Sequence, residues 1–313
     1  MKNLILLTTA LTSVTSTGHA SEPPVIENAG DTINSEWHEA FSTITADGLT
    51  LYVSSDRPSD MGGGEPGGFY LFSNYNIYVS HRADTAAPWS PLTMLPAPIN
   101  SPSTDHSPYL SEDGLSLYFM SDRPGGSGQG DLYVSHRTDP ADDAGWGPAI
   151  NLEPDINGPF VESCPTVVET DGTLHLFYIQ ISGRPDALPD FMTSDWDPDR
   201  QAFALPRKIS ISTPQGDSHL EPEKGLIWGM DWPGGQGGSD IWQTSYAPQN
   251  GDYASGWTQP VNLGDWINTE HEEIMPSPTA DGSLLIFQSD RPGGIGGMDI
   301  YFAHSPDYPL TEP

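Results

Sequence analysis

Short runs of alternating apolar and polar residues recur along this chain, each followed by a turn rich in glycine and proline. The clearest case lies within residues 100–137, where the run 115–120 (LSLYFM) leads into the turn 121–126 (SDRPGG) and a second run, 131–137 (DLYVSHR). Alternation with a period of two is typical of β-strands, and two such runs joined by a Gly/Pro turn predict a β-hairpin.

Imperfect copies of this hairpin recur at nearly constant spacing. The turn sequence Ser-Asp-Arg-Pro returns at 55–58 and 289–292, and a related turn lies at 231–235. Each unit opens with Asn, or once with Ser, at these positions: Asn34, Asn100, Asn157, Ser212 and Asn268. The first spacing of 66 residues exceeds the later ones of 57, 55 and 56 because extra residues follow the first turn.

Each unit contains four predicted strands. The first ends at a turn of the Asp-Gly type, as at 113–114, which is a strong hairpin signal. The second and third form the hairpin described above, and runs such as 146–152 indicate a fourth. No stretch has a helical period, and a fixed period of several short strands is the pattern of a propeller. We therefore expect an all-β fold, a five-bladed β-propeller with four-stranded blades.

The N-terminal part of the chain predicts how the ring closes. Residues 24–34 (PVIENAGDTIN) resemble residues 260–268 (PVNLGDWIN), which contain a predicted fourth strand. The last unit ends near His304 without such a strand. We expect the N-terminal strand to join the last blade, which removes exposed sheet edges.

Residues 1–20 have the features of a secretory signal: Lys2, then an apolar run, then small residues ending at Ala20. The rest, 21–313, is expected to form one domain that is periplasmic or secreted. Cys164 is the only cysteine, so no intramolecular disulfide forms, and no cysteine directly follows the signal to carry a lipid. We expect Cys164 to be a small buried apolar residue and not a nucleophile.

The chain is strongly acidic, with 43 Asp and Glu against 11 Lys and Arg and a net charge of −32. Such a surface repels nucleic acid and anionic lipid, so neither is an expected partner. The charge is spread along the chain, as in a solvated surface, and a monomer is expected.

The repeated motif has a counterpart in a known family. An acidic residue and proline, then Asp-Gly, then LYF-SDRPGG-x-G-x-DLY resembles the WD-like propeller repeats of the TolB type. The resemblance covers nearly all of the chain after residue 20, but leaves no room for the extra N-terminal domain of TolB itself. It implies an exported propeller without implying one activity, because that family includes envelope scaffolds, peptidase-associated propellers and sugar-acid lyases.

One position is acidic in every unit. It lies five residues after each opening residue and holds Glu39, Asp105, Glu162, Asp217 and Glu273. Because the first strand of each blade lines the axis of a propeller, we expect these carboxylates around one channel. Such like charges need raised pKa values or a counter-charge, and oxygen ligands suit Ca²⁺ or another divalent cation. Alternatively, each acid hydrogen-bonds the start of the neighbouring strand.

Histidines and aromatic residues accompany these acids. Four histidines lie within two residues of the acidic position and could ligate a transition metal: His38, His106, His219 and His271. Aromatic residues expected at the channel mouth are Trp37, Trp232, Trp266 and, in the insertion, Phe69, Tyr70, Phe72 and Tyr75. The Asp and Arg of the SDRP turns are expected to be structural: Asp caps backbone N–H groups, and Arg bridges to a carboxylate of the adjoining blade.

Two functions of different class remain open. The first is an exported binding propeller whose acidic mouth takes a glycan, peptide or protein partner. The second is a carbohydrate-active enzyme, by analogy with five-bladed glycosidases that carry acids on the inner strands of successive blades. Glu39, Asp105 and Glu162 would then be the catalytic trio. A metal-dependent lyase that uses the histidines, resembling oligogalacturonate lyases, is a variant of this second reading.

Overall fold

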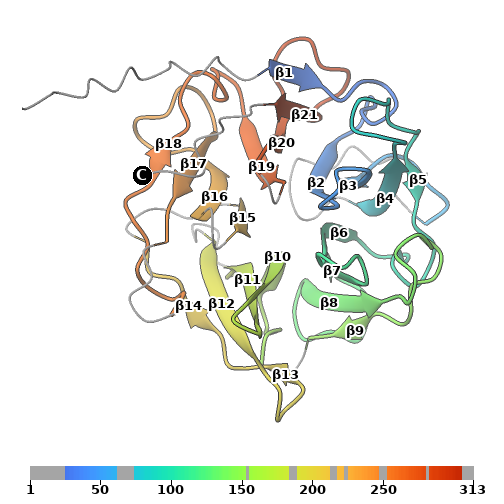
Figure 1. Ribbon diagram of the computed structural model, residues 1–313, viewed down its shortest axis with the longest axis vertical. Coiled ribbons are helices and arrows are strands. Elements are labelled where there is room, and N and C mark those ends of the chain that lie inside the picture. Colours follow the sequence, from blue (N-terminus) through green and yellow to red (C-terminus); the bar gives the residue numbers. More distant parts are fainter. Residues whose placement is uncertain are drawn as a thin grey trace, which may run out of the picture.

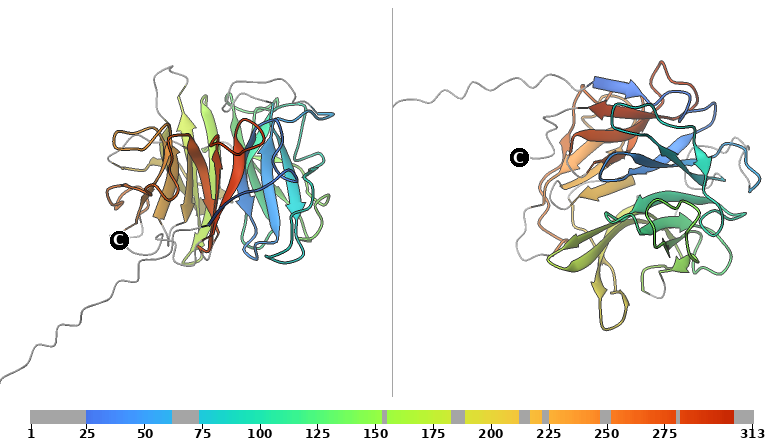
Figure 2. Two further views of the ribbon diagram at one scale, coloured as in Figure 1. Left: turned by 90° about the horizontal axis from the view of Figure 1, so that it is seen from above. Right: turned by 45° about the vertical axis from the view of Figure 1, so that its right-hand side comes forward.

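The computed structural model describes residues 25–61, 74–152, 155–182, 189–211, 217–221, 225–246, 252–279 and 282–304. These residues form five antiparallel sheets arranged around a central axis (Figure 1). Their strands stand roughly along that axis (Figure 2). The all-β class and the propeller-like arrangement are confirmed, and each sheet corresponds to one repeat unit. No helix in the described part of the chain is long and apolar enough to cross a membrane.

The sheets follow one another along the chain. The first contains β2 (Glu39–Ile44), β3 (Thr50–Ser55), β4 (Asn76–His81) and β5 (Thr93–Met94). The second contains β6 (Asp105–Leu110), β7 (Ser116–Ser121), β8 (Asp131–His136) and β9 (Ile150–Asn151). The third contains β10 (Val161–Thr170), β11 (Thr173–Ile181), β12 (Asp190–Asp197), β13 (Ala202–Phe203) and β14 (Arg207–Lys208). The fourth contains β15 (Asp217–Glu221), β16 (Gly225–Met230), β17 (Asp240–Thr244) and β18 (Val261–Asn262). The fifth contains β19 (Glu273–Pro278), β20 (Leu284–Ser289), β21 (Asp299–His304) and the N-terminal β1 (Val25–Asn28).

The third sheet departs from the expected four strands. Its outer edge is divided, because β13 pairs with one part of β12 and β14 with another. The first strands β2, β6, β10, β15 and β19 lie innermost (Figure 1), and each contacts the next until β19 meets β2. The first strands of the five sheets therefore surround the axis.

The N-terminal strand completes the fifth sheet, as the sequence predicted. β1 pairs antiparallel with β21, with Val25 opposite His304 and Asn28 opposite Tyr301. The apolar seam between the fifth and first sheets packs Leu51 and Val53 against Ile286. The two ends of the described chain are thus joined by hydrogen bonds and by core packing.

The opening asparagines explain why the repeat begins with this residue. Asn100 is 1% exposed, and its side-chain amide donates to the carbonyl oxygen of Ile77 (2.8 Å) and accepts from the N–H of Ile77 (2.8 Å). Asn157 makes the same pair with Leu132, and Asn268 with Ile241. Each amide therefore attaches a unit to the third strand of the preceding sheet and satisfies buried backbone groups there.

Asn34 makes the same pair of hydrogen bonds across the point where the ring closes. Its amide donates to the carbonyl oxygen of Ile300 at 3.0 Å and accepts from the N–H of Ile300 at 2.8 Å. The first unit is thereby attached to β21, the third strand of the last unit.

A β-bulge interrupts four of the five inner strands at one position. The register shifts in β2, β6, β10 and β19, and the residue two positions after the acid has a positive φ. These residues are Phe41 (44°), Ser107 (54°), Cys164 (52°) and Met275 (49°). A positive φ is unfavourable for any residue with a Cβ, so the bulge is a strained and repeated feature of the axis.

Candidate functional site

The acidic residue of each repeat lies at the start of the inner strand. The carboxylates of Glu39, Asp105, Glu162 and Glu273 are each 0% exposed. The backbone of Asp217 begins β15, and its side chain lies outside the described residues. The position of these acids on the innermost strands agrees with the sequence, but their side chains make their contacts within their own sheets.

Glu39 shows how such a carboxylate is held. It accepts hydrogen bonds from the N–H and hydroxyl of Ser35 (2.8 and 2.7 Å) and from the hydroxyl of Ser55 (2.9 Å). Arg57 Nη2 lies 2.8 Å from Glu39 Oε1. The side chain thus caps the turn before β2 and neutralises its charge with the arginine of the SDRP turn.

Two other sheets repeat this arrangement. Asp105 pairs with Arg123 at 2.6 Å, and Glu273 pairs with Arg291 at 3.1 Å. In each case the arginine belongs to the same sheet as its acid, so the expectation that it bridges to the adjoining blade is wrong. The reason is geometric: antiparallel pairing of the first two strands places the turn directly beside the start of the inner strand.

The aspartates of these turns act as the sequence predicted. Asp56 accepts from the N–H of His38 at 2.8 Å, and Asp122 accepts from the N–H of Thr104 at 2.9 Å. Both therefore cap backbone donors at the start of the neighbouring inner strand.

Glu162 differs from the other described acids. It accepts from the backbone N–H of Gly158 at 3.2 Å and from Gln180 Nε2 at 3.0 Å, and no arginine among the described residues contacts it. Gln180 lies opposite Glu162, where Ser55 lies opposite Glu39. Burial raises the pKa of Glu162 to about 7, and the hydrogen bonds from Gly158 and Gln180 only partly oppose this.

Burial also raises the pKa of Glu39, although Ser35 and Arg57 act against it. Desolvation therefore disfavours the charged form of Glu39 even though an arginine pairs with it, so a charge at these buried positions costs free energy. Glu162 has the neutral amide of Gln180 as a side-chain partner, and burial raises its pKa to about 7.

We expect Glu162 to make stability depend on pH. Its folded-state pKa of about 7 lies above the value of 4.5 of an unperturbed glutamate, so the folded protein binds the proton more tightly than the unfolded chain does. Stability is therefore lost as pH rises from about 4.5 through about 7, by up to roughly 3 kcal/mol. The melting temperature of Glu162→Gln minus that of wild type should therefore be larger at pH 8 than at pH 5. Glu169→Gln, at an exposed position of the same strand, is the control and should show no such trend.

The histidines do not gather around one centre. His38 Nδ1 lies 3.1 Å from Asp56 Oδ2, and this hydrogen bond raises the pKa of His38 against the effect of burial. His271 Nδ1 lies 3.7 Å from Asp290. His106 is fully buried and stacks on Phe41. The side chain of His219 lies outside the described residues.

No group of three or more His, Cys, Asp or Glu side chains in the described ranges could hold a metal ion. For these residues the expected axial cation is therefore not supported. For Glu39, Asp105 and Glu273 the physical reason is that the arginines of the turns already supply the counter-charge that the sequence interpretation assigned to a cation.

The predicted aromatic residues have mixed locations. Tyr75 is 1% exposed and makes edge contacts with Phe41 and His106, so it is a core residue and does not overhang the mouth. Trp232 packs on Trp242, and Trp266 packs against the core between the fourth and fifth sheets. Trp37 is half-buried. Phe69, Tyr70 and Phe72 lie outside the described residues.

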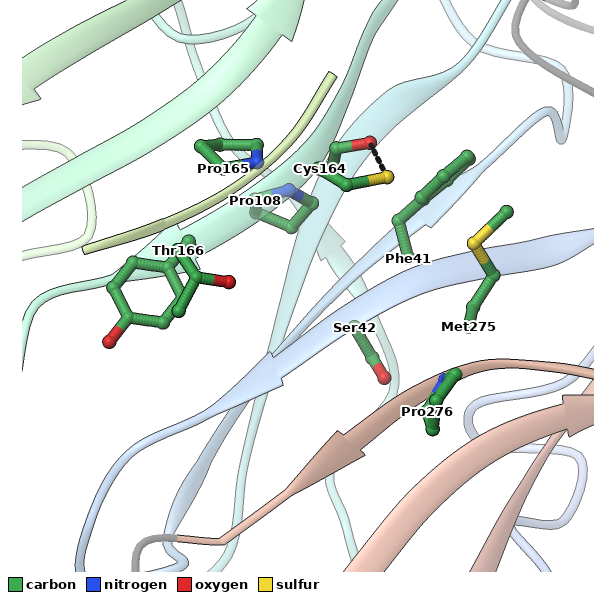
Figure 3. A pocket seen from close by; sticks show the side chains of 10 residues that line it. Phe41, Ser42, Pro108, Cys164, Pro165, Thr166, Met275 and Pro276 are labelled. Carbon is green, nitrogen blue, oxygen red and sulfur yellow. Dashed lines mark hydrogen bonds between the residues drawn. The ribbon is translucent and has the colours of Figure 1, made fainter. Parts of the chain in front are cut away.

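Sequence analysis missed a pocket on the axis (Figure 3). Its volume is about 40 Å³. It is lined by the four bulge residues and by residues that follow them: Phe41, Ser42, Ser107, Pro108, Tyr109, Cys164, Pro165, Thr166, Met275 and Pro276. A signal was present in the sequence, since the residue two positions after the acid is followed by proline in three units.

Comparison with known proteins supports the fold. No protein-family model matches the sequence, and no curated protein matches it, so the resemblance to TolB-type repeats stays a prediction. Solved structures do resemble it. An α-L-arabinofuranosidase from Lactobacillus brevis has 14% identity and a TM-score of 0.53 over 87% of this chain and 92% of that one. An endo-arabinase from Bacteroides thetaiotaomicron has 12% identity and a TM-score of 0.53 over 91% and 97%.

A third similar structure is a protein of unknown function from Dyadobacter fermentans, with 14% identity and a TM-score of 0.50 over 90% of this chain and 99% of that one. At these identities the likeness establishes the propeller fold shared with glycoside hydrolases. The activity has to be argued from this chain's own residues.

Proposed function

We propose that this protein is a carbohydrate-active five-bladed propeller in which Glu162 donates a proton to the leaving oxygen of a neutral glycan. The observation that carries the proposal is the pKa of Glu162 of about 7, in a buried site where no arginine of the described residues contacts the carboxylate. A general acid works best when its pKa lies near the working pH. The named activities of the similar arabinofuranosidase and arabinanase agree with this class of substrate.

Asp105 is the proposed partner acid. It begins β6, which contacts β10, the strand that carries Glu162. Asp105 is ion-paired with Arg123, whereas Glu162 has the neutral partner Gln180. Two carboxyl groups in such different environments suit the roles of base and acid in glycoside hydrolysis.

The substrate is proposed to be uncharged. With a net charge of −32, the protein repels polyanions such as uronic acid chains, and it does not repel neutral sugars. Substrate would approach Glu162 through the loop after Asn157, where Gly158 donates to the carboxylate and Phe160 is 37% exposed. Binding would exchange the Gly158 contact for one to the sugar oxygen.

A screen of neutral glycans tests the proposal. Arabinan, galactan and xylan are incubated with the protein and the release of reducing ends is measured. We expect wild type to cleave at least one of them, and Glu162→Gln to lower kcat at least about 100-fold with a small change in KM. Glu169→Gln is the matched control and should keep full activity. Undiminished cleavage by Glu162→Gln would show that the acid is another residue.

A second candidate is the binding propeller. It is favoured by the complete burial of Glu39, Asp105 and Glu273, each already neutralised by an arginine. Calorimetric titration with the same glycans separates the two functions. Binding without release of reducing ends, with the same affinity in Glu162→Gln, would favour the binding role over catalysis.

A further inference from the structure

A serine that lines the axial pocket contacts a buried histidine behind it. Ser107 Oγ lies 2.7 Å from His106 Nδ1, and Ser107 lines the pocket. Both residues come from β6, next to Asp105, and neither has a role in the glycan chemistry proposed above.

The β-bulge makes this contact possible. In a regular strand, neighbouring side chains point to opposite faces of the sheet. In β6 the register shifts between His106 and Tyr109, and Ser107 has a φ of 54°. The backbone therefore turns at Ser107, and its hydroxyl meets the imidazole of the preceding residue. Strained backbone of this kind persists only where the surroundings enforce it, and it often marks a functional residue.

The surroundings fix the histidine and place a hydroxyl and a thiol beside the serine. The His106 ring stacks on Phe41 (centroids 4.6 Å apart, planes at 19°) and receives the edge of Tyr75 at 5.8 Å. Ser163 Oγ and Cys164 Sγ, from the neighbouring strand β10, lie 3.1 and 3.8 Å from Ser107 Oγ. The side chains of Phe41, Cys164 and Met275 converge on the same pocket (Figure 3).

We propose that Ser107 is a nucleophile for short-chain acyl esters, with His106 as its general base. A serine that faces a pocket and is hydrogen-bonded to a histidine is the minimal unit of nucleophilic catalysis. Ser107 Oγ attacks the ester carbonyl carbon while its proton passes to His106 Nδ1. The bond to the alkoxy oxygen then breaks, and the leaving alcohol takes the proton from His106 Nδ1.

Water completes the reaction. It attacks the acyl carbon and gives a proton to His106 Nδ1, and the bond from the acyl carbon to Ser107 Oγ breaks as that proton returns to the serine. The net change is ester plus water to acid plus alcohol, with no other reactant. The hydroxyl of Ser163 lies 3.1 Å from Ser107 Oγ, and in this mechanism it would donate a hydrogen bond to the oxyanion that forms during each attack.

The size of the pocket selects the acyl group. The pocket is small, with a volume of about 40 Å³, so a short acyl group fits it better than a long one. An acetyl group is a short acyl group of this kind. The strong negative charge of the protein favours an uncharged ester. The inferred substrate is therefore an acetyl ester of a neutral alcohol.

The test uses p-nitrophenyl acetate with the intact protein. We expect hydrolysis with a transient acetyl adduct, located on Ser107 by mass spectrometry of the quenched digest. Ser107→Ala should lower kcat at least 100-fold. Ser107→Gly should do the same while keeping or raising the melting temperature, because glycine accepts the positive φ at position 107 without strain. Loss of activity in a well-folded Ser107→Gly protein therefore cannot be attributed to unfolding.

The controls are the other nucleophilic side chains of the pocket. Ser42→Ala removes a hydroxyl that also lines the pocket, and it should leave the rate within twofold. Cys164→Ala should leave the adduct on Ser107. The proposal is overturned if the acetyl group is found on Cys164, if no adduct forms, or if Ser107→Gly hydrolyses the ester at the wild-type rate. Cleavage of glycans by the same preparations is scored separately, since Ser107→Gly retains Glu162.

Discussion

Removal of residues 21–28 is expected to lower the melting temperature by more than about 10 °C. The deletion takes away β1, which pairs with residues 301–304 of β21 and forms the outer edge of the fifth sheet. It also removes Asn28, whose side chain donates to Asp299 at 2.9 Å. Several buried or half-buried hydrogen bonds at about 1 kcal/mol each, at roughly 2–4 °C per kcal/mol, give a shift of this size.

Calorimetry or circular dichroism measures the shift. The matched control is Glu27→Gln, which changes an exposed side chain of β1 without removing the strand, and its melting temperature should stay within about 2 °C of wild type. Asn34→Ala should fall between the two, because it leaves the N–H and carbonyl of Ile300 without their side-chain partner. If the deletion variant has the melting temperature of wild type, the ring is closed by other contacts.

The sequence carried enough information for this closure because repeats are redundant. The similarity of residues 24–34 to 260–268 assigned the N-terminal segment to the outer strand of a sheet that lacked one, and the register of β1 against β21 agrees. The same redundancy located the acids on the inner strands. Both predictions required only the order of elements along the chain.

The side-chain contacts of these acids could not be predicted from the order of elements alone. The alternating pattern of an inner strand does not indicate that the carboxylates of Glu39 and Asp105 pair with the arginine of the turn in the same sheet. That arrangement depends on the register of the first two strands and on the bulge two residues later, which shifts every following side chain. The Ser107–His106 contact was hidden for the same reason, because adjacent residues of a regular strand do not meet.

The largest effect of a single substitution is expected at Arg123. Its guanidinium bonds Asp105 at 2.6 Å and the carbonyl oxygens of Pro98 and Ile99, and it lies over the Tyr133 ring at 5.0 Å. Arg123→Met leaves the Asp105 carboxylate, which is 0% exposed, without its counter-charge. Removing one partner of a buried ion pair costs about 3–5 kcal/mol, because the remaining charge stays out of water. Urea unfolding at neutral pH measures this loss.

A double-mutant cycle separates the lost charge pair from the lost packing of Arg123. Asp105→Asn keeps the size of the acid and removes its charge, so adding it to Arg123→Met should recover a large part of the lost stability. Arg200→Met is the control for removing an arginine that pairs at the surface. Arg200 bonds Asp155 with 45% of its side chain exposed, and its loss should change stability little. If Arg123→Met loses as little stability as Arg200→Met, water reaches the Asp105 carboxylate in solution. The turns would then not shield the acids of the inner strands from solvent. If the double variant is no more stable than Arg123→Met, the contacts of Arg123 with the two carbonyl oxygens and Tyr133 matter more than its charge pair.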